Sequence, residues 1–246
     1  MQRGIWNLAL RHLAHHTGGS RLLNHVLPGA VQSLHHAGGG VVHWPVWYEP
    51  GYVGPVGMLE SRRLEQHWEG VREYEDQCRE GFSASRYPGV VESFVRDYAR
   101  ILDGRDPEAA FVRLWELLER LVGLSEEERH TEVTKRAAFL VRAELRSLQY
   151  RVLEALRRHR NAGVHEGILP SDARALLRQL ERFVVIALEF HLDNRFDFSG
   201  LREVAMFLSQ PSEEGRLRQR IRSLEQGRES DLRLARIAME YHGYAP

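Results

Sequence analysis

Residues 125–165 read SEEERHTEVTKRAAFLVRAELRSLQYRVLEALRRHRNAGVH, and this stretch decides the fold. Its apolar residues recur at helical spacing, and Ser125 with Glu128 forms a capping box at its start. We therefore predict one long amphipathic helix over residues 125–159. This helix runs directly into the polar segment that begins at Arg160.

Helical patterns also account for most of the remaining chain, so we predict an all-α fold. Asp106 followed by Pro107 marks one helix start, because aspartate is a favourable N-cap and proline suits the first helical position. The other predicted helices cover residues 3–16, 20–36, 58–80, 88–103, 107–122, 171–195, 199–208, 211–226 and 228–242.

The exception is residues 41–48, which are β-branched and aromatic and follow three glycines. They predict a short strand or hairpin, which Pro45 confines to a sheet edge. We divide the chain accordingly into a small N-terminal α/β extension over residues 1–57, a helical bundle over residues 58–198 and a C-terminal helical extension over residues 199–246.

The composition is that of an ordinary globular protein, with 43% apolar residues and a formal net charge of zero. Any attraction to nucleic acid must therefore come from local patches. The longest apolar run, residues 183–188, is too short to cross a bilayer, so we expect no membrane partner. The single cysteine, Cys78, excludes an internal disulfide framework and fits a reducing cytosol, so we expect a cytoplasmic protein. Cys78 lies in a charged amphipathic helix, so we expect an inert thiol rather than a nucleophile.

The first 48 residues carry arginines and histidines but no acidic residue. We interpret them as a mildly basic interaction arm rather than a transit peptide, because serine is scarce. The paired histidines at positions 15–16 and 35–36 have no cysteine or acidic ligand beside them, and adjacent histidines on a helix point about 100° apart. We therefore predict no metal site.

The segment from Arg160 to His165 contains the parts of a metal-free site that cleaves phosphodiesters. A guanidinium binds phosphate, an amide orients its neighbours and an imidazole moves protons near neutral pH. Positions 160 and 165 are rotated by about 140° on an ideal helix, so one straight helix keeps them on different faces. Either Gly163 ends or bends the helix, or a second protomer faces the first across a two-fold axis.

This segment resembles the R-x(4–6)-H signature of HEPN domains, particularly the Apea-like branch with R-N-x-x-x-H-G. Asn161 follows the arginine here, whereas Glu166 is inserted before the glycine. Upstream, residues 115–119 (WELLE) are similar to the W-x-x-L-E helix of that branch, and Tyr150 lies on the helix that leads into the motif. The resemblance covers roughly residues 60–195.

The resemblance implies a HEPN-type bundle that acts as a metal-independent endoribonuclease without a cofactor. Two copies of the motif share one cleft in such proteins, and the ribose 2′-OH attacks the adjacent phosphate. In this chain His165 would be base and acid, Arg160 would stabilise the phosphorane and Asn161 would orient a neighbour. The implied setting is a prokaryotic antiviral defence or toxin–antitoxin system. RNA and a second copy of the chain are the implied partners, with any antitoxin or defence-complex protein a separate polypeptide.

Basic residues just before the motif are candidates for holding the RNA backbone. They are Arg151, Arg157, Arg158 and His159, with a single Glu154 between them. The same cations also suit a helix C-terminus. Glu119 and Tyr150 are candidates for support of the site, although packing explains them equally well, and Trp115 is expected in the core. The seven arginines of residues 216–236 either extend the RNA surface or form a solvated face.

Two other interpretations stay open. One is a non-catalytic HEPN module that binds RNA or a partner protein within a larger defence complex, with Arg160 and Asn161 capping the helix and His165 on a surface loop. The other is a structural helical adaptor that docks through its N-terminal arm and the segment of Trp44 and Trp47. Dimerisation discriminates among them, because the composite site needs two copies and a stable monomer that never pairs would favour the adaptor.

Overall fold

The computed structural model describes residues 4–6, 8–9, 31–35, 41–48, 61–103, 106–123, 125, 131–166, 173–224 and 229–244. Side chains are not described in the two strands or at residues 61–67, 163–166 and 174. The described residues are predominantly helical, as predicted. The chain divides into a first unit of residues 2–75 and a second unit of residues 76–246, to which Met1 is assigned. The domain boundaries at 57/58 and 198/199 stay predictions.

The first unit contains a two-stranded antiparallel sheet formed by β1 (Val31–His35) and β2 (Val41–Tyr48). Because β1 lies within the predicted helix 20–36, that helix is wrong for residues 31–35. A short apolar run fits either period, and pairing with β2 decides here. The pairing jumps from Gln32↔Trp47 to Leu34↔His43, which leaves Pro45 in an irregular part of the ladder where its missing N–H is tolerated.

Helical residues near the N-terminus pack on α2 (Ser61–Ala84), a helix that begins in the first unit and ends in the second. Ile5 and Leu8 are fully buried. Trp6 donates a hydrogen bond from Nε1 to Glu75 Oε2 at 2.7 Å and meets the ring of Trp68 edge-on at a centroid distance of 5.9 Å. These residues of the predicted interaction arm are therefore packed within their own unit, whereas residues 10–30, with the first histidine pair, lie outside the described residues.

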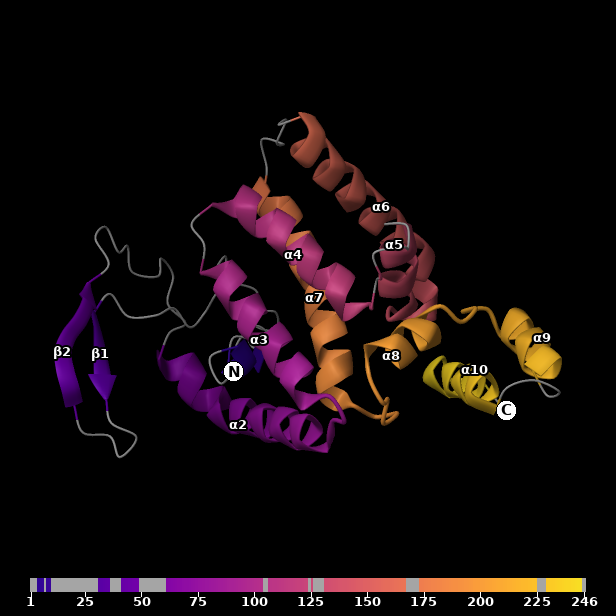
Figure 1. The fold of residues 1–246 in the computed structure, drawn as a ribbon, viewed down its shortest axis with the longest axis horizontal. Coiled ribbons are helices and arrows are strands. Elements are labelled where there is room, and N and C mark those ends of the chain that lie inside the picture. Colours follow the sequence, from indigo (N-terminus) through magenta and orange to yellow (C-terminus); the bar gives the residue numbers. More distant parts are fainter. Residues whose placement is uncertain are drawn as a thin grey trace. The chain divides into compact units, whose positions relative to one another are not determined.

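The core of the second unit is built on α4 (Pro107–Leu121) and α7 (Ala173–Asp193), which pack side by side, with α3 (Pro88–Leu102) against both (Figure 1). Trp115 on α4 is fully buried, as predicted. Asp106 caps α4 by accepting a hydrogen bond from the backbone N–H of Glu108 at 2.9 Å, so the predicted helix start is confirmed. The predicted helices at 88–103, 107–122 and 171–195 are thus confirmed as α3, α4 and α7.

The predicted single helix over residues 125–159 is wrong, because it is two helices, α5 (Thr131–Phe139) and α6 (Ala143–Glu166). The break is stabilised by two side chains, one local and one distant, that donate hydrogen bonds to carbonyls between the helices. Tyr241 donates its hydroxyl to the Leu140 carbonyl at 3.1 Å, and Arg146 donates to the Val141 carbonyl at 3.3 Å. The capping box falls partly on residues 126–130, which lie outside the described residues.

Three short helices complete the second unit, α8 (Leu201–Leu208), α9 (Glu214–Leu224) and α10 (Glu229–Tyr241). Aromatic side chains join α8 and α10 to α5 and α7. Phe207 on α8 stacks on Phe190 of α7 at a centroid distance of 5.7 Å, and Phe139 on α5 stacks on Tyr241 of α10 at 5.8 Å. This cluster places the C-terminal helices in one unit with the bundle.

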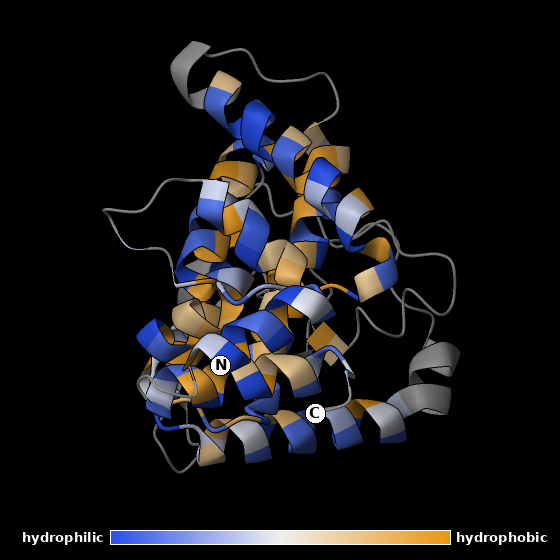
Figure 2. Cartoon of the chain, turned by 90° about the vertical axis from the view of Figure 1, so that its right-hand side faces the viewer, coloured by the Kyte–Doolittle hydropathy of each residue, from blue (hydrophilic) through white to orange (hydrophobic). Residues whose placement is uncertain are grey.

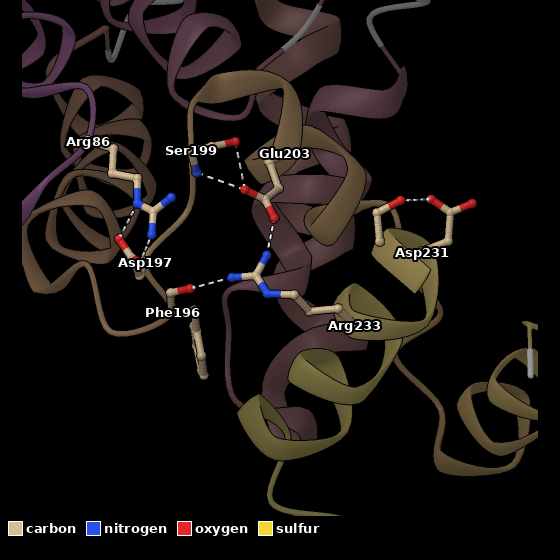
Figure 3. A network of polar contacts seen from close by, with 8 residues as sticks. Arg86, Phe196, Asp197, Ser199, Glu203, Asp231 and Arg233 are labelled. Carbon is tan, nitrogen blue, oxygen red and sulfur yellow. Dashed lines mark hydrogen bonds and ion pairs between the residues drawn. The ribbon is translucent and has the colours of Figure 1, made fainter. Parts of the chain in front are cut away.

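Ion pairs hold the loop between α7 and α8 (Figure 3). Arg86 makes a two-pronged contact with Asp197, with Nε donating to Oδ1 at 2.9 Å. Glu203 at the start of α8 accepts the backbone N–H of Ser199 at 2.7 Å and pairs with Arg233 of α10. The carboxylate of Glu203 is therefore already bound by Ser199 and Arg233, so it does not neutralise the neighbouring Arg202.

Candidate RNA-binding face on α6

The predicted motif occupies the last turns of α6. Of the two arrangements predicted, an end of the helix at Gly163 is wrong, because α6 continues through this residue to Glu166. One glycine costs a helix interior only about 1 kcal/mol, which does not by itself break it. Arg160 and Asn161 therefore do not cap the helix, and residue 165 is helical rather than part of a loop. The side chain of His165 lies outside the described residues.

Arg160 lies on the face of α6 that packs into the bundle. It follows Leu153 by seven positions and Leu156 by four, and both leucines are fully buried. Arg160 is itself half-buried, and its Nε is out of contact with water without a hydrogen-bond partner. Its Nη1 reaches Asn161 Oδ1 only at 3.5 Å, which is a weak hydrogen bond. The guanidinium is thus held by packing more than by polar contacts.

Position 165 falls on the opposite side of the helix from this packed face. On an ideal helix it is rotated by about 140° from position 160, but by only about 20° from position 158 and about 40° from position 151. Arg151 and Arg158 are exposed, and so is His159. The structure therefore groups Arg151 and Arg158 with position 165 rather than with Arg160.

Among the described residues, Arg157 is the predicted RNA-binding arginine that forms an ion pair on its own helix. Its Nη2 lies 2.9 Å from Glu154 Oε2, and Glu154 also hydrogen-bonds the hydroxyl of Thr134 on α5 at 2.7 Å. The hydrogen bond from Arg157 lowers the pKa of Glu154, and the carboxylate in turn raises the pKa of Arg157. Glu154 therefore links α6 to α5, and Arg157, paired with it, offers RNA less charge than its exposed neighbours.

The two residues proposed to support the site, Glu119 and Tyr150, lie on different helices, α4 and α6. Trp115 donates from Nε1 to Glu119 Oε1 at 2.7 Å, so the carboxylate of Glu119 is bound to a core residue of its own helix. Tyr150 is half-buried on α6, about two turns before Arg157. The four-residue spacing from Trp115 to Glu119 is thus explained locally by a hydrogen bond across one turn of α4.

Sequence reasoning missed an apolar stripe on the exposed side of α6. Leu145 and Leu148 are large hydrophobic residues, 47% and 58% exposed. The stripe alternates spacings of three and four residues, and its apolar members are Leu145, Leu148, Val152, Ala155 and Ala162, with the polar His159 in the same register. This is the a/d pattern of a helix that pairs with another helix. Figure 2 shows hydrophobic residues recurring among hydrophilic ones along α6. The period of about 3.5 residues was the signal in the sequence from which this stripe could have been predicted.

The described residues contain no group of three His, Cys, Asp or Glu side chains arranged to hold a metal ion. None of the described helices combines the length and the apolar character needed to cross a bilayer. The chain matches no protein-family model, no curated protein and no solved structure. The function of this chain must therefore be inferred from the residues of α6 and their surroundings.

Proposed function

We propose that the protein is a HEPN-type, metal-independent endoribonuclease of a prokaryotic defence or toxin–antitoxin system, with an active site completed by a second copy of the chain. The observation that carries this proposal is the exposed apolar stripe of α6, because it runs along the helix up to the motif. An unbroken helix keeps positions 160 and 165 on different faces, so two copies are needed to gather both residue types around one phosphate.

Parallel pairing of two α6 helices about a two-fold axis brings both motifs to the same end of the pair. In the register of the stripe, positions 151, 158 and 165 flank the contact on one side. Arg151 and Arg158 then lie along the approach to the cleaved phosphate, where their charge attracts the RNA backbone. Antiparallel pairing would separate the motifs by most of the helix and leave each site incomplete.

The proposed reaction needs only side chains of this chain. The ribose 2′-oxygen bonds to phosphorus while the bond from phosphorus to the 5′-oxygen breaks, which leaves a 2′,3′-cyclic phosphate and a 5′-hydroxyl. His165 of one copy takes the proton of the 2′-hydroxyl, and the second copy of this histidine protonates the departing 5′-oxygen. Arg160 stabilises the negative charge of the phosphorane, and Asn161 orients its neighbours by hydrogen bonding.

Substitution of the motif tests this function directly. We expect Arg160→Ala and His165→Ala each to slow cleavage of labelled RNA by about a hundredfold or more, without a large change in the thermal unfolding midpoint. Arg222→Ala on α9 removes an exposed charge elsewhere and should leave the rate unchanged. Cleavage should persist in EDTA. Undiminished cleavage by both motif variants rules out the catalytic assignment, and loss of cleavage on chelation rules out the metal-free mechanism.

A second candidate function is a non-catalytic module that binds RNA or a partner protein. The observation that favours it is the continuity of α6 through Gly163, which leaves Arg160 on the packed face while position 165 joins the exposed arginines. This candidate predicts a dimer that binds RNA without cutting it. Incubation of the purified dimer with labelled RNAs, followed by separation of the products on a denaturing gel, distinguishes the two functions.

A further inference from the structure

A groove of about 1080 Å³ crosses the second unit between α3, the end of α4, α8 and α9. Helices α8 and α9, which supply part of its lining, lie at the other end of the second unit from the C-terminal turns of α6 (Figure 1). Four arginines line the groove, namely Arg120, Arg136, Arg202 and Arg220, against a single aspartate, Asp231. Arg220 belongs to the arginine-rich segment 216–236, so the groove is where part of that charge meets the bundle.

Two of these arginines form the fixed wall of the groove. Arg136 is only 4% exposed, donates from Nε to Ser209 Oγ at 2.9 Å and donates from Nη1 to the Gly123 carbonyl at 3.0 Å. Arg120 lies over the ring of Phe94 at 5.2 Å and pairs with Asp97 at 2.8 Å. Both side chains are held by protein partners, so they set the shape and the field of the groove.

The other two arginines present their charge to solvent. Arg202 and Arg220 are exposed, and neither guanidinium has an ion pair or hydrogen bond with any of the described residues. The carboxylate beside Arg202 is occupied, since Glu203 binds Arg233 and Ser199 (Figure 3). Asp231 reaches only the hydroxyl of Ser230, at 3.5 Å. Two guanidiniums on different helices thus remain available for an anion.

The floor between these arginines is preformed. Gly123 has φ of 67°, a left-handed conformation that favours glycine. A Cβ built there would lie 2.8 Å from the carbonyl oxygen of Leu201 and 2.9 Å from the Cβ of Ala205. The end of α4 and the start of α8 are therefore pressed together, and Arg202 is carried on a rigid element.

The chemistry of the lining favours nucleic acid over an acidic peptide. Arginine binds both phosphate and carboxylate, so charge alone does not decide. The groove also has apolar walls, Leu201, Met206 and Pro211, and Met206 is 36% exposed. A single strand of nucleic acid combines an evenly charged backbone with apolar base faces, whereas an acidic peptide offers charge without such faces.

We propose that this groove binds the backbone of single-stranded RNA, with Arg202 and Arg220 contacting phosphates. The choice of RNA over DNA depends on the proposed function, because the arginines by themselves recognise only the phosphate. The groove would hold a part of the RNA strand remote from the motif and so add affinity without taking part in cleavage.

The test uses the full-length protein and a labelled 2′-O-methyl oligoribonucleotide of about 12 nucleotides, which cannot be cut by 2′-OH attack. Each phosphate contact to a single strand contributes about 0.7 to the slope of log K against log salt, so Arg202→Ala with Arg220→Ala should reduce that slope by about 1.4. The matching loss of affinity is about 25-fold in ~0.1 M salt and fades toward ~1 M salt. Neither substitution removes a described ion pair, so the thermal midpoint should not change.

The matched control is Arg222→Ala with Arg236→Ala, which removes two exposed charges from the same arginine-rich segment outside the groove lining. An equal loss of slope in this control means diffuse attraction and overturns the groove. Unchanged RNA affinity in the groove variant also overturns it, as does binding of polyglutamate in place of RNA. A groove that binds the uncleavable probe in a protein that cuts no RNA supports the groove and rejects only the nuclease.

Discussion

At the scale of single residues, His191 shows how a buried polar side chain fastens the core of the second unit. It lies on α7 and is only 1% exposed. Its Nε2 donates to the Leu121 carbonyl at the end of α4 at 2.8 Å, and its Nδ1 accepts from the Tyr87 hydroxyl at 2.9 Å. A carbonyl can only accept, so these contacts specify the neutral tautomer with its proton on Nε2.

His191 should therefore make stability depend on pH. Burial lowers its pKa from 6.5 to about 4, so between these values the unfolded chain binds a proton that the folded chain does not. Its stabilising contribution is complete above pH 6.5 and is lost as pH falls toward 4, with about 2 kcal/mol lost between pH 7 and pH 5. Urea unfolding at several pH values measures this loss.

The control for this prediction is His191→Gln, which has no group that titrates in that range. We expect this variant to be less stable than the wild type at pH 7 but to lose less stability on acidification. His242 also has a pKa lowered to about 4 by burial, so some pH dependence should remain. An identical pH dependence in variant and wild type would contradict the role of His191.

At the scale of helices, the chain uses close backbone contact as well as side-chain packing. Gly81 near the end of α2 touches α7, and a Cβ placed on it would lie 1.6 Å from the Leu192 carbonyl oxygen. Gly70 on the same helix has no such neighbour within 4 Å. The two glycines therefore have different roles although both are helical.

Alanine substitutions at these two glycines should have opposite effects. We expect Gly81→Ala to destabilise the second unit by about 2 kcal/mol or more, because α2 and α7 must move apart. Gly70→Ala should stabilise its helix by up to about 1 kcal/mol, since alanine is the better helix former. Urea unfolding measures both, and a Gly81→Ala variant as stable as the wild type would disprove the close contact.

The helix α6 also shows why a local motif is not yet a site. Leu153 and Leu156 turn one face into the bundle, and Arg160 follows that face. Because residue 163 does not interrupt the helix, the position of His165 is carried to the other side. On one unbroken helix the two motif residues do not share a face, so the proposed nuclease requires a second chain.

At the scale of the whole molecule, the central prediction is a dimer through the apolar stripe of α6. Leu145→Glu with Leu148→Glu places two charges on residues that are 47% and 58% exposed, so the fold should tolerate them. Because the apolar contact is lost, we expect the dimer dissociation constant to be at least about tenfold higher than that of the wild type. Sedimentation velocity measures this constant, and RNA cleavage should fall in parallel.

Met206→Glu is the matched control, because Met206 is an exposed hydrophobic residue on α8 outside the stripe. It should leave self-association unchanged. A wild-type chain that stays monomeric at all concentrations, or a stripe variant that pairs as tightly as the wild type, would exclude the proposed pairing. Persistent cleavage by a monomer would exclude the composite site as well.

The sequence by itself determined the elements whose signals are local. The helices α3, α4 and α7 follow from apolar periodicity, and the start of α4 follows from Asp106, whose side chain caps it. The burial of Trp115 follows from its place in the same pattern. Such features depend on neighbours within one turn, which the chain itself supplies.

The tertiary structure decided everything that depends on distant partners. The break between α5 and α6 is stabilised by Tyr241 on α10, a hundred and one positions from the carbonyl that it binds. β1 is a strand rather than a helix because β2 pairs with it. Arg157 pairs with Glu154, which also binds Thr134 on α5. Arg202 and Arg220 line the same groove only because four helices converge there. Periodicity reports which face of a segment is apolar, but only packing selects what that face meets.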